Sequence, residues 1–176
     1  MASFLRHRPV IGHPFRLLVS TFKYIVALHL FWEYGYSLSP AHGSSMMPTI
    51  DISDEWMLTS KRHRYGRGVQ VGDMVVYKIP IFRDADGMKR VLGMPGDYVM
   101  IDSPESGSDN MIQVPQGHCW VVGDNLPASR DSRIFGPVPL ALISGKVIAC
   151  MRTPGPGFEF KWITNPLERC SSTSEA

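Results

Sequence analysis

The chain has 176 residues, of which 44% are hydrophobic and 19% charged, and its formal net charge is +2. This size and composition suit one globular domain and exclude a largely disordered chain, and so small a charge gives no support for a nucleic-acid partner. Three widely spaced cysteines, Cys119, Cys150 and Cys170, exclude a disulfide framework. Because neither a CxxC nor an HExxH pattern occurs, we expect no metal site and no other cofactor.

The first part of the chain predicts a membrane anchor. Residues 1–16 form a basic segment, and no acid occurs before Glu33. An apolar run then begins at residue 17, and it reaches the roughly 20 residues of a spanning helix when it continues to residue 38, with Trp and Tyr at its end as interfacial aromatics. We predict a single transmembrane anchor over residues 17–38. An amphipathic surface helix and a removed targeting peptide are the alternatives.

Beyond the anchor, the sequence predicts a mostly β domain over residues 39–152. Short segments rich in Val, Ile, Met and aromatic residues are separated by Gly, Pro, Asp and Asn, which is typical of strands. The predicted strands are residues 55–60, 73–79, 88–94, 97–102, 111–114, 118–123 and 145–151. Many short strands with few helical patterns favour an all-β or mostly β fold.

Three segments between or after these strands are predicted to be irregular. Residues 103–110, SPESGSDN, are interpreted as a loop or hairpin tip. The basic run at 61–68 is predicted to be a solvated loop, with contact to nucleic acid or anionic lipid as the alternative. TPGPG at 153–157 is predicted to end the ordered core, which leaves residues 153–176 as a C-terminal tail.

The stretch HGSSMMPTI, residues 42–50, combines turn formers with two large apolar methionines, which is unusual for a simple connection. Ser45 in it is either a turn or cap residue or a nucleophile. A free hydroxyl attacks weakly, so a nucleophilic serine needs a base. None of the six histidines stands in a recognisable triad context.

A lysine is the alternative base. Lys89 lies in the apolar stretch MKRVLGMPGD, residues 88–97. An ordinary lysine is protonated at neutral pH, but burial among apolar side chains disfavours the ammonium and lowers the lysine pKa. A desolvated Lys89 would therefore be able to take a proton from a serine. The alternative is a lysine that points to water, as most strand lysines do.

A third stretch, GDNLPASRDSRIFGPV at residues 123–138, is dense in turn formers and paired charges. Asp131 and Arg133 are two residues apart, so they share a face if the segment is extended. Ser129 carries a small hydroxyl that is able to orient a nearby amine.

Taken in order, SMMPT, KRVLGMPGD and GDN…S.DSR.FGPV resemble the type I signal peptidase family over residues 40 to about 150. The resemblance implies a signal-peptidase-like (LexA-like) β-fold and a serine endopeptidase that uses a Ser/Lys dyad. On the matching positions, Ser45 is the nucleophile and Lys89 the general base. Ser129 then orients the lysine amine, and Asp131 and Arg133 brace the site.

The same resemblance explains the methionines. In the family, the residue after the nucleophile lines a small apolar pocket for the substrate residue before the cut. Met46 matches that position, and we expect Ile50 and Met88 to form further walls.

The oxyanion hole is one departure from the bacterial pattern. Bacterial members carry a serine two residues before the nucleophile, which donates to the oxyanion, and this chain has Gly43 there. The oxyanion would then rely on the Ser45 backbone N–H, with help from Ser44 or a water.

Within the family, the chain resembles subunit 1 of the mitochondrial inner membrane peptidase, in its fungal form. The resemblance is carried by Gly43, the single anchor, the Arg-rich start and the FGPV ending. The other catalytic subunit typically has asparagine where this chain has Arg133. The resemblance implies a single-pass protein of the mitochondrial inner membrane, in contact with its lipid, with the catalytic domain facing the intermembrane space. It implies precursors with bipartite presequences as substrates and the second catalytic subunit as partner.

Four alternatives stay open at this point. A bacterial-type signal peptidase at another membrane would share the motifs. The endoplasmic-reticulum type uses histidine in place of the lysine, which Lys89 disfavours. A self-cleaving repressor with the same chemistry would carry a DNA-binding domain in place of an anchor. A catalytically silent assembly subunit would not need Ser45 and Lys89 intact.

Overall fold

The computed structural model describes residues 14–52, 55–82, 85–102, 107, 110–152, 157 and 159–167. The chain divides into two compact units, residues 1–35 and residues 36–176. Most of the predicted basic N-terminal segment, most of the loop at 103–110 and Cys170 lie outside the described residues.

The first unit is a helix with an apolar surface. The α-helix α1 (Pro14–Leu30) continues into a π-helical turn, η1 (Phe31–Gly35), and neither buries a residue. Together they form 22 residues that are long and apolar enough to cross a membrane. The helical segment begins before the predicted start at residue 17. It also ends before residue 38, because Tyr36 to Leu38 pair with the next strand instead.

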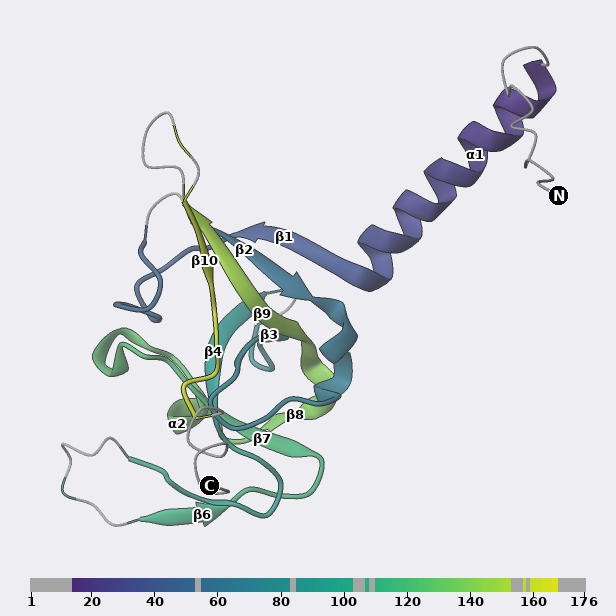
Figure 1. Ribbon diagram of the computed structural model, residues 1–176. Helices are drawn as coiled ribbons and strands as arrows, with labels where there is room; N and C mark the ends of the chain where they lie inside the picture. Colours follow the sequence, from purple (N-terminus) through teal and green to yellow (C-terminus); the bar gives the residue numbers. More distant parts are fainter. Residues whose placement is uncertain are drawn as a thin grey trace, which may run out of the picture. The chain divides into compact units, whose positions relative to one another are not determined.

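The second unit is built from antiparallel strands (Figure 1). Its large sheet has the order β1-β2-β9-β3-β4-β7-β8, with β10 paired to β9, and β5 and β6 form a separate two-stranded sheet. The strands of the large sheet are β1 (Tyr36–Pro40), β2 (Glu55–Ser60), β3 (Met74–Lys78), β4 (Asp86–Gly93), β7 (His118–Val122), β8 (Val138–Pro139), β9 (Ile143–Arg152) and β10 (Glu159–Trp162). The small sheet pairs β5 (Tyr98–Met100) with β6 (Met111–Gln113). This confirms the predicted mostly β fold behind one apolar N-terminal helix.

The sheet curls around apolar side chains that alternate along its strands. One buried cluster contains Val75, Tyr77, Val91 and Val121 from the central strands β3, β4 and β7. A second cluster contains Met57, Met74, Val147 and Cys150 from β2, β3 and β9, together with two residues of the loop after β1. Because Met74 and Val75 are consecutive and point to opposite faces of β3, the two clusters lie on opposite faces of the sheet there.

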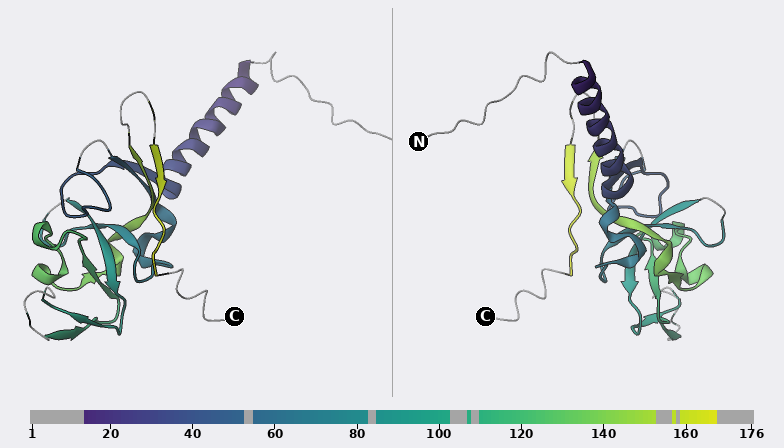
Figure 2. Two further views of the ribbon diagram at one scale, coloured as in Figure 1. Left: turned by 60° about the vertical axis from the view of Figure 1, so that its left-hand side comes forward. Right: turned by 90° about the vertical axis from the view of Figure 1, so that its right-hand side faces the viewer.

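Three strands were not predicted: β1, β8 and β10. The strand β10 lies within the predicted C-terminal tail and pairs antiparallel with β9, and Figure 2 shows the two strands running together. All four of its residues are exposed. Its hydrogen bonds to β9 hold it in place, so no burial pattern reveals it in the sequence. The tail prediction is wrong for residues 159–162.

The basic run predicted as a loop forms short 3₁₀ turns, η2 (Lys61–Gly66), that are interrupted by a kink with non-helical backbone at residues 63–65, and no residue of η2 is buried. Its charged side chains remain at the surface, as the prediction of a solvated segment requires.

Candidate active site

Ser45 lies in a tight turn whose apolar side chains pack into the core. The turn covers residues 45–49, and on it Met46 and Ile50 are each only 2% exposed and pack into the methionine-rich cluster. The Ile50 N–H donates to the Met46 carbonyl at 3.0 Å, which closes the turn. Met46 and Ile50 thus anchor the turn in the core, while Ser45 stays half-buried at its edge.

Lys89 reaches Ser45 from the central strand β4. Its side chain is 6% exposed, and its Nζ donates to Ser45 Oγ at 2.7 Å and to the Met88 carbonyl at 2.9 Å. Burial lowers the pKa of the Lys89 amine, and the negative charges of Asp131 and Asp124 partly oppose that shift. The predicted alternative, a lysine pointing to water, is therefore wrong.

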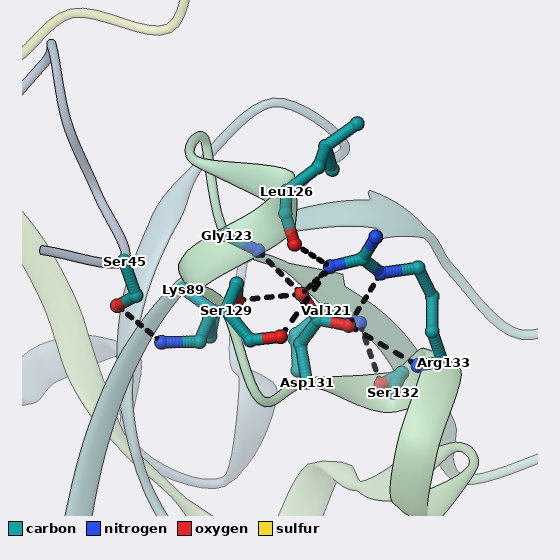
Figure 3. A network of polar contacts seen from close by, with 9 residues as sticks. All are labelled: Ser45, Lys89, Val121, Gly123, Leu126, Ser129, Asp131, Ser132 and Arg133. Atoms are coloured by element: carbon teal, nitrogen blue, oxygen red, sulfur yellow. Dashed lines mark hydrogen bonds and ion pairs between the residues drawn. The ribbon is translucent and has the colours of Figure 1, made fainter. Parts of the chain in front are cut away.

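Ser129 sits beside this pair but does not bond to the amine in this structure. Its hydroxyl, on a side chain 6% exposed, donates to Asp131 Oδ2 at 2.6 Å. Figure 3 shows the Ser45–Lys89 pair at one end of the polar network and Arg133 at the other. The expected contact between Ser129 and the lysine amine is replaced here by the bond to Asp131, whose carboxylate is the stronger acceptor.

Asp131 and Arg133 form an ion pair, but not in the extended conformation that their spacing suggested. Asp131 is the N-cap of a short helix, α2 (Ser132–Phe135), and its Oδ1 accepts from the Arg133 N–H at 3.2 Å and from Arg133 Nε at 2.8 Å. Burial acts to raise the pKa of the fully buried Asp131 carboxyl. Hydrogen bonds from Arg133, Ser129 and the Gly123 N–H outweigh that effect and lower the pKa.

The GDN stretch after β7 holds the backbone on both sides of the nucleophile. The Asn125 N–H donates to the Ser45 carbonyl at 3.0 Å, and Asn125 Nδ2 donates to the Ser44 carbonyl at 3.0 Å. The Gly123 N–H donates to Asp131 Oδ2 at 3.0 Å. Ser44 therefore contributes its carbonyl to this clamp.

Gly123 leaves the space in which Ser45 and Ser129 approach each other. A Cβ at this position would overlap Ser129 Oγ and lie 2.5 Å from the Ser45 carbonyl oxygen. Only glycine allows Ser45 and Ser129 to approach each other this closely across the strand end.

Asp124, the residue between Gly123 and Asn125, connects the turn that carries Ser45 to strand β4. Arg90 donates to it through Nε at 2.8 Å and through Nη2 at 2.7 Å, and Thr49 Oγ1 donates to it at 2.5 Å. Arg90 also donates to the Gly72 carbonyl at 2.9 Å. Five residues of this network were not predicted to belong to the site, although each stands inside one of the three quoted stretches: Thr49, Arg90, Gly123, Asp124 and Asn125. Their role depends on contacts between stretches far apart in the chain, which spacing does not display.

A cleft of about 320 Å³ opens beside the hydroxyl and the amine. Met46 and Met88 line it, as expected for substrate-binding walls, and Ile50 does not, because it faces the core. Further apolar lining that the sequence analysis missed comes from Ile79, Ile81, Phe82, Ala128 and Phe135. The chemistry of the site is thus a hydroxyl bonded to a desolvated amine in a cleft that both apolar and polar residues line.

Comparison with known proteins finds relatives over most of the chain. The family model described as signal peptidase, peptidase S26, matches residues 15–105 and 102–152. Mitochondrial inner membrane protease subunit 1 of Schizosaccharomyces pombe is 40% identical over 136 residues, which cover 77% of this chain and 85% of the relative. The human subunit 1 is 40% identical over 141 residues, covering 80% and 84%, and the Saccharomyces cerevisiae subunit 1 is 34% identical over 169 residues, covering 82% and 89%.

A subunit 2 is also among the relatives. That of Schizosaccharomyces pombe is 31% identical over 151 residues, covering 84% of this chain and 82% of the relative, against 40% for subunit 1 of the same organism. The resemblance to subunit 1, stated from Gly43 and Arg133, is confirmed. The motifs, the fold and the matches agree, and the chain belongs to the signal peptidase, peptidase S26 family.

Proposed function

We propose that this protein is a membrane-anchored serine endopeptidase that removes sorting presequences from proteins delivered to the mitochondrial intermembrane space. The observation that carries the proposal is the 2.7 Å hydrogen bond between Lys89 Nζ and Ser45 Oγ, in a site that lowers the lysine pKa. A hydroxyl bonded to an amine that gives up its proton readily is the arrangement that nucleophilic catalysis needs.

The acylation step follows from these contacts. Neutral Lys89 takes the Ser45 hydroxyl proton as Ser45 Oγ forms a bond to the scissile carbonyl carbon. The protonated amine then gives that proton to the leaving nitrogen as the C–N bond breaks. The Met88 carbonyl, 2.9 Å from Nζ, keeps the amine directed at the reacting atoms throughout.

In deacylation, a water takes the place of Ser45 as the nucleophile. A water gives a proton to neutral Lys89 and attacks the acyl carbon, and the proton returns to Ser45 Oγ as the ester bond breaks. The oxyanion in both steps lies against the Ser45 N–H, with Ser44 or a water as a further donor. Asn125 fixes the Ser44 and Ser45 carbonyls, so it orients the peptide plane that carries this N–H.

Ser129, Asp131 and Arg133 support the dyad from behind. Arg133 donates two side-chain hydrogen bonds to Asp131, which accepts from Ser129. In this proposal Ser129 positions the amine by packing beside it. Its oxygen is also free to accept from the lysine ammonium once Ser45 has acylated.

The placement of the protein rests on its relatives and on its apolar helix. The relatives are named as mitochondrial inner membrane protease subunits, and Pro14–Gly35 supplies one segment able to span that membrane and contact its lipid. With positive charge ahead of the anchor, the catalytic unit faces the intermembrane space. The partner is a second catalytic subunit, and the substrates are precursors with bipartite presequences.

The competing function is a catalytically silent assembly subunit. A bacterial-type enzyme at another membrane is the other alternative, and the names of the relatives disfavour it. Both are tested by the processing of an inner-membrane-sorted precursor in mitochondria that lack the native chain and carry a variant of it. Ser45→Ala and Lys89→Ala are compared with Ser39→Ala and Lys161→Ala, which change an exposed serine and an exposed lysine outside the cleft.

We expect the precursor to accumulate in Ser45→Ala and Lys89→Ala, while both control variants process it and all four proteins persist with their partner. Normal processing by the Ser45→Ala protein would leave a scaffolding role as the explanation. Normal processing by Lys89→Ala alone would remove the Ser/Lys mechanism.

A further inference from the structure

The cleft beside Ser45 holds one strong cation that the proposed chemistry does not use. Arg130 lines the cleft together with Ser45, Met46 and Met88, and its side chain is exposed. It lies between two buried residues that belong to the catalytic support, Ser129 and Asp131.

The local backbone directs this side chain away from the support and toward the cleft. Ser129 has φ −105° and ψ 126°, and Asp131 has φ −147° and ψ −164°, so both are extended. Side chains alternate in an extended segment. Because Ser129 and Asp131 point inward and bond to each other, Arg130 must point to the opposite side. The hydrogen bond between Ser129 and Asp131 also fixes the backbone position of Arg130.

The described acids around Arg130 are paired with other cations. Asp131 is paired with Arg133, and Asp124 is paired with Arg90. Among the described residues that line the cleft, Asp86 is the acid, and it pairs with Lys78 at 2.9 Å. Across the residues that the structure describes, none of the ion pairs involves Arg130.

We infer that Arg130 is a specificity-determining residue that binds an acidic side chain of the substrate close to the scissile bond. The inference deepens the proposed peptidase function and rests on it. A guanidinium stays charged at any working pH and presents a planar fork that matches a carboxylate. A substrate chain in the cleft shields this contact from water, which strengthens it relative to an open surface pair.

The test uses the full-length protein, purified in detergent from the membrane with its co-purifying subunits. Its substrates are peptides with one cleavage site that differ only by Asp for Asn at each position flanking the cut. The variants are Arg130→Gln and the charge reversal Arg130→Glu. Arg62→Gln is the matched control, because Arg62 is an exposed arginine outside the cleft.

We expect the wild type to cleave the peptide with Asp at one flanking position with a kcat/KM about tenfold above that of its Asn counterpart. Arg130→Gln should abolish this ratio, because kcat/KM for the Asp peptide falls to that for the Asn peptide, and Arg130→Glu should reverse it in favour of the Asn peptide. Arg62→Gln should keep the wild-type ratio.

Two results would overturn the inference while the peptidase function stands. One is equal cleavage of Asp and Asn peptides by the wild type at every position. The other is an Arg130→Gln protein that slows all peptides alike and shifts the pH profile, which would mean that the arginine only acts on the charge of Lys89. If wild type cleaves no peptide at all, the peptidase function itself fails, and the specificity role falls with it.

Discussion

Lys89 Nζ lies 2.7 Å from Ser45 Oγ, although 44 positions of the chain separate the two residues. The turn after β1 brings the serine to strand β4, and burial removes the lysine from water. The contact is costly for stability, since a buried lysine favours its neutral form. A site that accepts such a cost is typical of catalysis.

Replacing Lys89 should separate activity from stability. Lys89→Arg keeps a cation but has no accessible neutral form, so we expect kcat to fall about 10²–10⁴-fold. Lys89→Met should lose the same activity yet raise the unfolding free energy by about 1 kcal/mol, as removal of a strained functional group commonly does. Peptide cleavage and thermal unfolding of each variant measure the two effects. A destabilised Lys89→Met protein would contradict this account.

The pH dependence of the wild type should follow the Lys89 amine. Since burial lowers its pKa from 10.5, activity should rise with pH along a limb that lies below 10.5. Stability should also rise with pH between the lowered folded pKa and 10.5, because there the unfolded chain binds a proton that the folded chain lacks. Lys89→Met should flatten this rise. An unchanged rise in Lys89→Met would assign it to another group.

Gly123→Ala should impair catalysis by pushing two residues of the site apart. The added Cβ would stand 2.5 Å from the Ser45 carbonyl oxygen and 2.7 Å from Ser129 Cβ. Because a misplacement of about 1 Å costs on the order of a hundredfold in rate, we expect a loss of that size in kcat. Gly157→Ala is the control, since a Cβ there meets open space. Equal activity of the two variants would show that the approach of Ser45 to Ser129 is not needed.

The Asp131 carboxylate should make the protein sensitive to acid. Its folded pKa is held below the ordinary 3.8, so its stabilising contribution is present above pH 3.8 and is lost as the pH falls through the folded value. Asp131→Ala should cost about 3–5 kcal/mol of unfolding free energy, because it leaves Arg133 without its carboxylate partner. Asp131→Asn should weaken the fold less and remove part of the acid transition. Urea titrations from neutral pH down to acid measure the unfolding free energy of both variants. If Asp131→Asn loses as much stability at acid pH as the wild type, the loss does not come from Asp131.

Arg90 and Asp124 should be energetically coupled. Both side chains are 16% exposed and they are joined by two hydrogen bonds, so a double-mutant cycle with Arg90→Met and Asp124→Asn should give about 1–3 kcal/mol. The exposed pair Lys78–Asp86, with both side chains 53% exposed, should give less than about 1 kcal/mol. Similar values for the two pairs would mean that Arg90 does not hold Asp124 against the Thr49 turn.

Much of this protein was determined by the sequence alone. The strand patterns predict β2, β3, β4, β5, β6, β7 and β9 to within a few residues, because alternation and turn formers are local signals. The apolar run near the N-terminus predicts the anchor helix by length and composition. Three short stretches in a fixed order were enough to identify the family, later confirmed by the comparisons.

Other features were decided only by the tertiary structure. The strand β10 has four exposed residues and forms because β9 offers an edge, which its own sequence does not display. The bond of Ser129 to Asp131, the place of Ile50 in the core and the clamp from Asn125 to Ser44 each depend on where distant segments meet. The Lys89 pKa belongs to the same class. A lysine has an ordinary pKa in an unfolded chain, and only packing that excludes water from around the Lys89 amine lowers it.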